Sequence, residues 1–402
     1  MHGLPALPDS LGLYLHLPWC LKKCPYCDFN SHAAPATLEE RAYVDALLQD
    51  FEQSVAALPG RRIASLFFGG GTPSLFSPES IARILDAVRA SGRLAEGAEI
   101  TLEANPGAAD SGRFRGYRQA GVTRLSIGVQ SFDDGLLKRI GRVHDGRAAQ
   151  DAVAAAAACF ERFSIDLMHG LPGQTPDQAR DDLRQALASG ATHLSCYQLT
   201  IEPNTAFYSA PPPLPSEPVA EVIEAAVYAE LEAAGFAQYE VSNWSRDEHA
   251  CRHNLNYWRY GDYLGLGAGA HSKLTTADGV FRSARLRKPA SFMSRVAQGR
   301  QIGEHKRVDA PDRRFEFLLN ALRLVDGFEL ELFEVRTGCA REEIDEPLER
   351  CAALGLLQMK QERVRPTHRG RRFLNAILRE FLPGGGADAV AGPPPAKMAG
   401  DR

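Results

Sequence analysis

Three cysteines stand close together near the beginning of the chain, within the segment YLHLPWCLKKCPYCDFN at residues 14–30. Cys20, Cys24 and Cys27 have the spacing C-x3-C-x2-C, and the next cysteine along the chain is Cys159. Three thiolates from one short loop can hold three irons of a cubic iron–sulfur cluster and leave the fourth iron without a protein ligand. The spacing therefore predicts a 4Fe–4S cluster whose open iron suits nitrogen and oxygen donors.

A zinc site is the alternative interpretation of the same triplet. Structural zinc takes four ligands, usually from two separated pairs, whereas here one triplet stands alone. His16 and His32 are the nearby side chains that can supply a fourth ligand, so this alternative stays open. A disulfide framework is disfavoured, because no paired spacing joins the remaining cysteines, Cys159, Cys196, Cys251, Cys339 and Cys351.

The surroundings of the triplet resemble a known family. Its spacing, the aromatic Tyr26 before the last cysteine and the flanking YLHLPWC at residues 14–20 are similar to the radical S-adenosylmethionine (SAM) superfamily. Within it they resemble the branch that holds oxygen-independent coproporphyrinogen III oxidase and related heme chaperones. The resemblance covers most of residues 11–272. It implies an open (β/α)6 partial TIM barrel and SAM bound at the open iron through its amino and carboxylate groups.

The order of the predicted elements agrees with that fold. Apolar patterns predict six strands that alternate with helices, at residues 11–17, 63–68, 99–104, 124–130, 163–168 and 193–201. This alternation is typical of an α/β fold with a parallel sheet. The first helix, residues 37–58, is expected to begin at a capping box of Thr37 and Glu40. Polar and glycine motifs follow the strands, at the edge where parallel α/β folds bind ligands.

A glycine-rich segment, GGGTP at residues 69–73, follows the second predicted strand. Glycines allow the backbone to approach a ligand closely and expose N–H donors to a carboxylate, while a tight strand-to-helix turn is the other interpretation. The family resemblance implies that Gly70, Gly71 and Thr72 contact the amino-acid end of SAM.

Polar side chains of later strands complete the implied SAM site. Glu103 lies in a strand that we expect to be otherwise apolar on that face, and a buried carboxylate needs a cationic or donor partner. Gln130, Arg142 and Asp166 match family positions that line the cofactor pocket, although Asp166 can also cap the next helix. The resemblance thus implies a SAM site of Tyr14, Tyr26, Gly70, Gly71, Thr72, Glu103, Gln130, Arg142 and Asp166.

Two features set this chain apart from the oxidase of the branch. The oxidase has a further cysteine two residues after the triplet, and here that position is Phe29. The segment HNLNYW at residues 253–258 resembles the HNxxYW motif associated with heme. A neutral imidazole is a common axial ligand of heme iron, and aromatic rings can cover a porphyrin face. We therefore predict heme contacts by His253, Asn254, Tyr257 and Trp258.

Other interpretations of this segment stay open. Cys251 and His271 are rival axial ligands, and the aromatic residues can instead pack on the barrel. Two functions follow from the resemblance. One is a heme chaperone that holds a 4Fe–4S cluster, SAM and heme, receives electrons from a donor and delivers heme to a recipient protein. The other is the radical SAM oxidase of porphyrin biosynthesis, which removes CO2 from porphyrinogen propionates. Phe29 and the HNLNYW segment favour the chaperone, and catalytic residues stay unassigned.

Composition sets the expectations about partners and location. A net charge of −4 gives no reason to expect nucleic acid as a partner. No apolar run reaches membrane-spanning length, which leaves room only for peripheral membrane contact. The first ten residues lack the basic and apolar segments of a signal peptide, and oxidisable thiols suit a reducing compartment, so we expect a cytoplasmic protein.

Composition shifts divide the chain into four expected regions. These are the radical SAM barrel with its cluster loop (1–209), an extension with the heme motif (210–307), a winged-helix-like α+β module (308–382) and a disordered tail (383–402). Residues 238–271 are expected to be loop-like. The winged-helix-like module is expected to close over the barrel mouth, the end where the strands finish.

Overall fold

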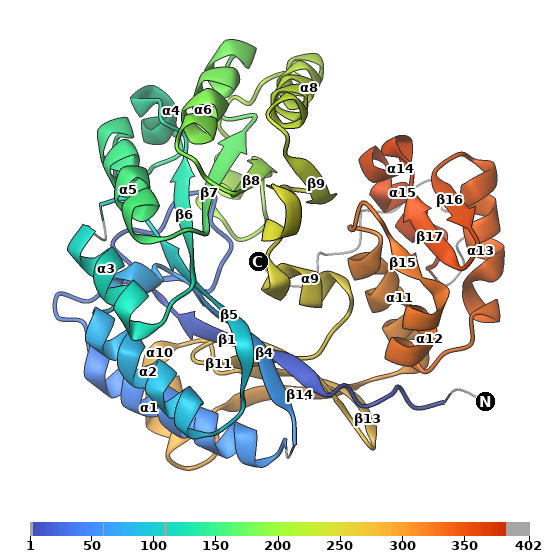
Figure 1. Ribbon diagram of the computed structural model, residues 1–402, viewed down its shortest axis with the longest axis horizontal. Helices are drawn as coiled ribbons and strands as arrows, with labels where there is room; N and C mark the ends of the chain where they lie inside the picture. Colours follow the sequence, from blue (N-terminus) through green and yellow to red (C-terminus); the bar gives the residue numbers. More distant parts are fainter. Residues whose placement is uncertain (1–2, 59, 108–110, 383–402) are drawn as a thin grey trace.

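The computed structural model describes residues 3–58, 60–107 and 111–382. Its main element is a 12-stranded sheet of order β14-β13-β12-β11-β1-β4-β5-β6-β7-β8-β10-β9 (Figure 1). Six neighbouring strands pair in parallel at its centre. They are β1 (Ser10–Leu17), β4 (Arg62–Gly70), β5 (Leu94–Ala104), β6 (Arg124–Gln130), β7 (Phe163–His169) and β8 (His193–Gln198). The six expected strands and the open α/β barrel are therefore confirmed.

Helices cover the outer face of this curved sheet (Figure 1). They are α1 (Glu40–Ala56), α2 (Pro78–Ala90), α3 (Ser111–Ala120), α4 (Asp134–Arg139), α5 (Gly146–Cys159), α6 (Pro176–Ala188) and α8 (Glu217–Ala233). Shorter elements lie in the connections, namely β2 (Trp19–Cys20), β3 (His32–Ala33), η1 (Pro73–Leu75) and α7 (Ala206–Ser209).

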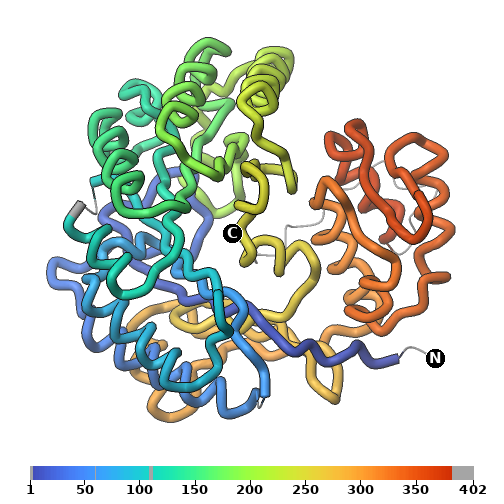
Figure 2. The backbone as a smooth tube through the Cα atoms, in the orientation of Figure 1, coloured from blue at the N-terminus to red at the C-terminus, as the bar shows by residue number. Residues whose placement is uncertain are grey.

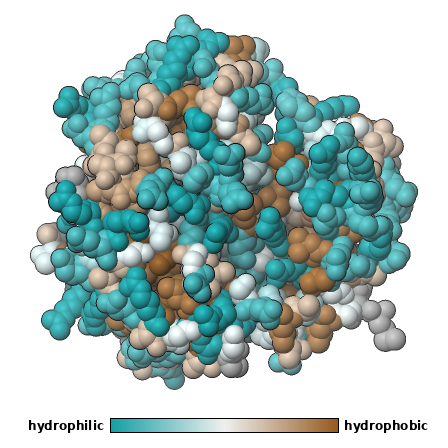
Figure 3. All heavy atoms as spheres, in the orientation of Figure 1, coloured by the Kyte–Doolittle hydropathy of each residue, from teal (hydrophilic) through white to brown (hydrophobic). Residues whose placement is uncertain are grey.

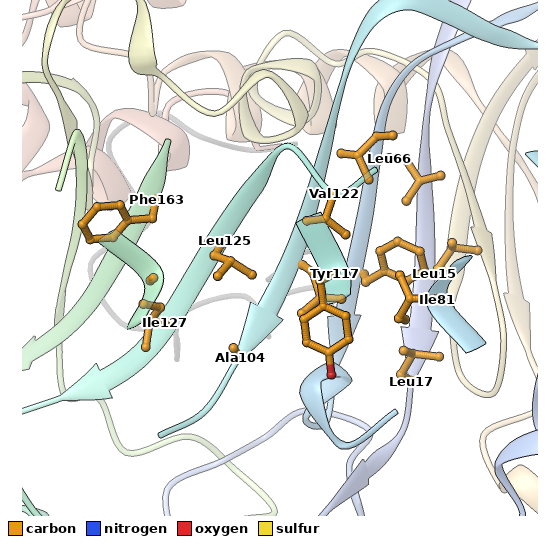
Figure 4. Close-up of a cluster of buried hydrophobic side chains, with 14 of the residues drawn as sticks. Leu15, Leu17, Leu66, Ile81, Ala104, Tyr117, Val122, Leu125, Ile127 and Phe163 are labelled. Atoms are coloured by element: carbon orange, nitrogen blue, oxygen red, sulfur yellow. The ribbon is translucent and has the colours of Figure 1, made fainter. Parts of the chain in front are cut away.

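The two faces of each central strand differ in polarity. Successive side chains of a strand point to opposite faces, so alternate residues meet the helices. Figure 4 shows Leu15 and Leu17 of β1 with Leu66 of β4 and Ile81 of α2 in this buried apolar layer. The same alternation along β5 puts Ile100, Leu102 and Ala104 in that layer and Glu99, Thr101 and Glu103 on the opposite face. The expectation that the Glu103 face is otherwise apolar was wrong.

The start of α1 also differs from the prediction. The helix begins at Glu40, and its N-cap residue, Glu39, makes no side-chain capping bond. The carboxylate of Glu40 instead accepts hydrogen bonds from the backbone N–H and the hydroxyl of Ser77, at the start of α2. A tertiary contact thus replaces the local capping box. The capping box within the described barrel joins Thr175 and Gln178 at the start of α6.

The region after α8 is more regular than expected. It contains β9 (Ala237–Glu240), β10 (Asn243–Ser245), η2 (Asp247–His249), α9 (Arg252–Trp258), β11 (Tyr263–Leu266), β12 (His271–Thr276), β13 (Gly279–Arg285), α10 (Pro289–Val296) and β14 (Ile302–Val308). The loop-like interpretation of residues 238–271 was wrong. These elements are short, and β11 is held by parallel pairing with β1, a strand about 250 residues earlier, which no local pattern reveals.

The last described part is a separate module with its own core (Figure 2). It consists of α11 (Ala310–Ala321), β15 (Phe328–Glu329), α12 (Leu330–Thr337), α13 (Glu342–Ala353), β16 (Leu357–Lys360), β17 (Arg363–Pro366), α14 (His368–Arg372) and α15 (Leu374–Arg379). Its three strands form a sheet of order β15-β17-β16, in line with the expected α+β module. The predicted tail at 383–402 lies outside the described residues.

The module does not cover the barrel mouth. The backbone N–H of Ala6, just before β1, donates to the carbonyl of Val335 in α12 at 3.0 Å. Glu316 of α11 accepts a hydrogen bond from Tyr260, and the Arg323 guanidinium lies 4.5 Å from the centre of the Trp258 ring. These contacts place the module at the amino ends of the strands, on the side where the chain begins in Figure 1. The expected closure over the mouth was therefore wrong.

The surface seen in Figure 3 is mostly hydrophilic, with apolar residues in small separate patches. None of the described helices combines the length and the apolarity that crossing a lipid bilayer requires.

Candidate functional site

The cysteine triplet lies on the loop that leaves the carboxyl end of β1. Cys20 ends the short strand β2, and the backbone N–H of Cys27 donates to the carbonyl of Cys24 at 3.1 Å. All three cysteines are free and only partly exposed. The loop is closed by β2 pairing with β3, which brings Trp19 beside His32. The sequence predicts that the three thiols share one loop, because they are neighbours along the chain.

Each thiol of the triplet contacts a different hydrogen-bonding group. The Thr72 hydroxyl donates to Cys20 Sγ at 3.5 Å, and Arg142 Nη1 donates to Cys24 Sγ at 3.7 Å. The sulfur of Cys27 lies 3.7 Å from the hydroxyl of Ser31. Burial raises the pKa values of the Cys20 and Cys27 thiols, so their thiolate forms need a positive partner.

This environment fits an iron–sulfur cluster on Cys20, Cys24 and Cys27. Groups that donate to sulfur are the usual outer partners of such clusters, and the buried Arg142 Nε has no partner of its own. When bound, the cluster would supply redox chemistry at its open iron.

The structure disfavours the zinc alternative, because the two histidines that could supply a fourth ligand already have hydrogen-bond partners. Both ring nitrogens of His16 are already bonded, Nδ1 to the Tyr14 hydroxyl and Nε2 to the Asn30 carbonyl, each at 3.0 Å. Nε2 of His32 lies 3.2 Å from the carbonyl of Arg287. Among the described residues, no three His, Cys, Asp or Glu side chains gather around a point that would hold a single metal ion. Three sulfurs that each bind a separate iron do not need such a point.

The glycine segment after β4 packs tightly against the cluster loop. A Cβ atom on Gly71 would lie 2.6 Å from the carbonyl oxygen of Trp19, and one on Gly70 would lie 2.5 Å from the His16 ring. Gly70 also has a φ of 113°, which favours glycine. Close packing alone therefore requires these glycines, whether or not a ligand approaches. Thr72, next in the turn, connects it to Cys20.

Two carboxylates, one on β5 and one on β7 with β6 between them, face the interior of the barrel. Glu103 Oε2 accepts a hydrogen bond from the Gly70 backbone N–H at 3.3 Å, and Asp166 accepts from the hydroxyls of Ser126 and Ser164. Burial raises the pKa of both groups, that of Glu103 to about 8. Both side chains nonetheless keep part of their surface accessible to solvent. Asp166 does not cap the next helix, because Thr175 does.

A polar network joins this interior to the cluster loop. Arg142 Nη2 donates to the side chain of Asn105 and to the carbonyl of Gly128, both at 2.6 Å. The amide of Asn105 in turn donates to the Thr72 hydroxyl at 2.8 Å. Asn105 was not among the predicted site residues, although its place directly after β5 is a signal that could have found it. Arg142, Thr72 and the cysteine loop are therefore brought together.

The remaining predicted SAM residues lie around the same end of the barrel. Gln130 ends β6 with a φ of 69°, a costly conformation for a residue other than glycine. Tyr26 packs beside Phe207, with ring centres 6.4 Å apart, and its pKa is raised by burial. The Tyr14 ring lies deeper, stacked 6.3 Å from Phe67. Of the predicted set, Tyr14 lies deepest, towards the amino end.

The heme motif lies at the opposite end of the barrel, on helix α9. His253 is 1% exposed, with Nδ1 2.9 Å from the Ser65 hydroxyl and Nε2 3.1 Å from the Tyr257 hydroxyl. Its ring stacks on Phe67 at 5.1 Å, and burial lowers its pKa to about 3. The imidazole is therefore neutral, as axial ligation requires, but both nitrogens are bonded.

The rest of the motif is divided between the barrel and the module. Trp258 packs under Arg323 of the module, whereas Asn254 and Tyr257 are partly exposed. Of the rival ligands, Cys251 is fully buried and burial raises its pKa to about 12, while His271 is exposed at the start of β12. The structure therefore does not bring the four predicted heme residues to one open surface.

Known protein families match both the barrel and the C-terminal module of this chain. The radical SAM superfamily model matches residues 14–186, and the HemN C-terminal domain model matches residues 308–373. The heme chaperone HemW of Escherichia coli (strain K12) is 46% identical over 374 residues, which cover 92% of this chain and 98% of that protein. HemW of Haemophilus influenzae is 42% identical over 385 residues, 94% of this chain and 99% of that protein.

Among solved structures, coproporphyrinogen III oxidase (HemN) from Escherichia coli matches with a TM-score of 0.78. The match covers 93% of this chain and 90% of that chain at 23% identity, and it shows a shared fold. The fold is common to the oxidase and the heme chaperones, so the higher sequence identity to the chaperones is what assigns the chain to one of them. The chain belongs to the radical SAM superfamily and, within it, to the family of the heme chaperone HemW.

Proposed function

We propose that this protein is a cytoplasmic heme chaperone that holds a 4Fe–4S cluster and SAM, binds heme and delivers it to a recipient protein. The observation that carries the proposal is the 46% identity to the E. coli heme chaperone HemW over 98% of that protein. Phe29 supports it, because the oxidase branch has a cysteine there. Eight free cysteines are in keeping with a reducing compartment.

The mouth of the barrel is the proposed site of the cluster and SAM. Cys20, Cys24 and Cys27 would bind three irons, and an electron donor would reduce the cluster from the partly exposed loop. Gly70 and Thr72 would hold the amino-acid end of SAM, while Glu103 and Asp166 would accept hydrogen bonds from its amino N–H or ribose hydroxyl groups. Gly71, Gln130, Arg142, Tyr14 and Tyr26 complete the proposed pocket.

Helix α9 is the proposed site of heme, with His253 as axial ligand. Ligation through Nε2 requires the Tyr257 hydroxyl to give way, because that hydroxyl lies 3.1 Å from the nitrogen. Giving up one neutral hydrogen bond costs about 1 kcal/mol, which is small beside a bond to iron. Opening α9 would also free Tyr257 and Trp258 to cover the porphyrin.

Titration of the anaerobically purified, cluster-loaded protein with hemin tests this function. The wild type is expected to retain hemin through gel filtration with a Soret band that depends on the oxidation state of the iron. His253→Ala should weaken binding or change the spectrum, since it removes the imidazole. Arg259→Ala, an exposed position just after the motif, should bind like the wild type. Loss of hemin from the wild type would contradict the chaperone function.

The oxidase is distinguished by a separate assay on the same preparation. With SAM, a reductant and an intact cluster, we expect no protoporphyrinogen from coproporphyrinogen III. Measurable product would reverse the choice between the two functions.

A further inference from the structure

A chain of hydrogen bonds crosses the barrel from Asp166 to the start of helix α9. The Ser164 hydroxyl is 3.3 Å from Asp166 Oδ1 and 2.8 Å from Nδ1 of His193. His193 Nε2 is 2.8 Å from the Tyr239 hydroxyl, which accepts the backbone N–H of Cys251 at 3.4 Å. Cys251 is the N-cap residue of α9. The chain thus joins β7, β8 and β9 to the helix that carries the heme motif.

The direction of every bond in this chain follows from its two ends. Cys251 can only donate through its N–H, and an ionised Asp166 can only accept. Ser164 therefore donates to Asp166 and accepts from Nδ1–H of His193. This tautomer leaves Nε2 as an acceptor for the Tyr239 O–H. Burial keeps His193 neutral by lowering its pKa, so a single tautomer has to serve both neighbours.

The amino end of α9 depends on this chain because the helix lacks a local cap. Its N-cap residue, Cys251, makes no side-chain capping bond. The first N–H groups of a helix have no partner within it and need one from outside. Tyr239 accepts from Cys251, and Glu99 Oε1 accepts from the next N–H, that of Arg252, at 2.9 Å. Two side chains of the barrel therefore hold the start of the motif helix.

Occupation of Asp166 by a ligand disturbs the same chain. A ligand donor that takes the carboxylate oxygen bonded to Ser164 leaves the Ser164 proton to turn towards His193. Nδ1 then has to accept, so His193 gives its Nδ1 proton to water and takes a proton from water at Nε2, which donates to the Tyr239 oxygen. The hydroxyl proton of Tyr239 then turns towards the N–H of Cys251, and two donors face one another. The number of protons is unchanged, but the N–H of Cys251 loses its partner, and Glu99 alone then holds the start of α9.

We propose that His193 and Tyr239 are positioning residues that link the SAM site to helix α9, so that SAM loosens the helix that carries the heme motif. This inference rests on the part of the proposed function that places SAM at Asp166. It supplies a reason why a heme carrier would hold SAM. Loosening α9 is also what ligation by His253 requires, because Tyr257 has to release Nε2.

Hydrogen exchange in the full-length, cluster-loaded protein tests the link without heme. Adding SAM to the wild type should speed exchange of the amides at 251–258 by roughly 5-fold or more, the lower range of coupling between sites. Tyr239→Phe removes the shared hydroxyl and should abolish this SAM-dependent change while SAM still binds. His193→Gln interrupts the chain at its middle and should have the same effect.

Tyr228→Phe is the matched control. Tyr228 is also a largely buried tyrosine, but its hydroxyl donates to Glu224 on α8, away from the chain. This variant should keep the wild-type response to SAM. If SAM binds the wild type and exchange at 251–258 does not change, or if Tyr239→Phe keeps the change, the link is overturned and SAM binding stands. If SAM does not bind at all, the proposed SAM site and the link are both overturned.

Discussion

The two ends of the barrel are built in opposite ways from the same strands. At the carboxyl ends, the thiols of the cysteine loop and the carboxylates of Glu103 and Asp166 are partly accessible. At the amino ends, α9 and the module fill the space, and buried ion pairs are held from several sides. One example is Asp262, which is bonded by Lys273, Arg61 and the Thr275 backbone N–H.

The carboxyl ends of the strands therefore carry the groups that bind ligands, and the amino ends carry the groups that stabilise the fold. Groups at the mouth are incompletely satisfied in the protein alone, which suits them to bind a cluster and a cofactor. Charged groups at the amino end, such as Asp262 with Lys273 and Arg61, pair with one another and so stabilise the fold. The heme motif belongs to the second end, which explains why it is closed in this structure.

Removing one thiol should have the largest effect and should act on the mouth alone. Cys24→Ala leaves two protein ligands for the cluster, so we expect loss of essentially all bound iron and sulfide after anaerobic reconstitution. Cys159→Ala, a cysteine at the end of α5, is the control and should keep wild-type iron. Stoichiometric zinc without iron in the wild type would show that the cluster assignment is wrong.

At the amino end, the largest expected effect is on stability. Burial opposes ionisation of Asp262, yet Lys273 and Arg61 lower its pKa to about 2. Lys273→Met leaves that carboxylate with one fewer cation and should lower the free energy of unfolding by about 3–5 kcal/mol. Cluster binding should persist below the unfolding transition.

Lys306→Met is the matched control for this prediction. Its Nζ also bonds an aspartate, Asp312, at 3.0 Å, but that pair lies on the surface. Urea unfolding should be nearly unchanged in this variant, because exposed pairs contribute little. If Lys273→Met and Lys306→Met lower the free energy of unfolding equally, the buried pair at the amino end does not stabilise the fold more than a surface pair.

A smaller effect on stability is expected at the mouth. Gly71→Ala places a Cβ against backbone atoms of Pro18 and Trp19 that cannot rotate away, at a cost of about 1–3 kcal/mol. Gly303→Ala on β14, where the nearest atom is 3.4 Å from the added Cβ, should change the melting temperature little. If the two variants melt alike, the glycine turn is not as tightly packed as described.

The mouth was largely predictable from sequence and the amino end was not. Cys20, Cys24 and Cys27 share one loop, and the glycine turn follows a regular strand, so local spacing identifies both. The surroundings of His253 come from distant segments, with Ser65 lying 188 residues away along the chain. Tyr239 and His193 likewise meet only through the order of strands in the sheet. No periodic pattern identifies such a cluster, which is why the segment around α9 was interpreted as a loop.

The last and smallest effect concerns the pH dependence of Glu103. Its pKa in the folded protein is raised from 4.5 to about 8 by burial, with Asp166 nearby adding to the rise. Between these values the unfolded chain is ionised while the folded protein retains the proton. The folded state then binds more protons, so this group lowers the free energy of unfolding as pH rises from about 4.5 to about 8.

SAM binding should show the opposite slope, because its amino N–H or hydroxyl donors favour the ionised carboxylate. We expect SAM affinity, measured by equilibrium dialysis, to rise towards about pH 8 and then level off. Glu103→Gln should remove this rise and weaken binding at high pH, whereas Glu96→Gln, at an exposed position of the same strand, should keep the wild-type profile. An unchanged pH profile in Glu103→Gln would show that this carboxylate does not contact the ligand, and would leave Asp166 as the acceptor at this end of the barrel.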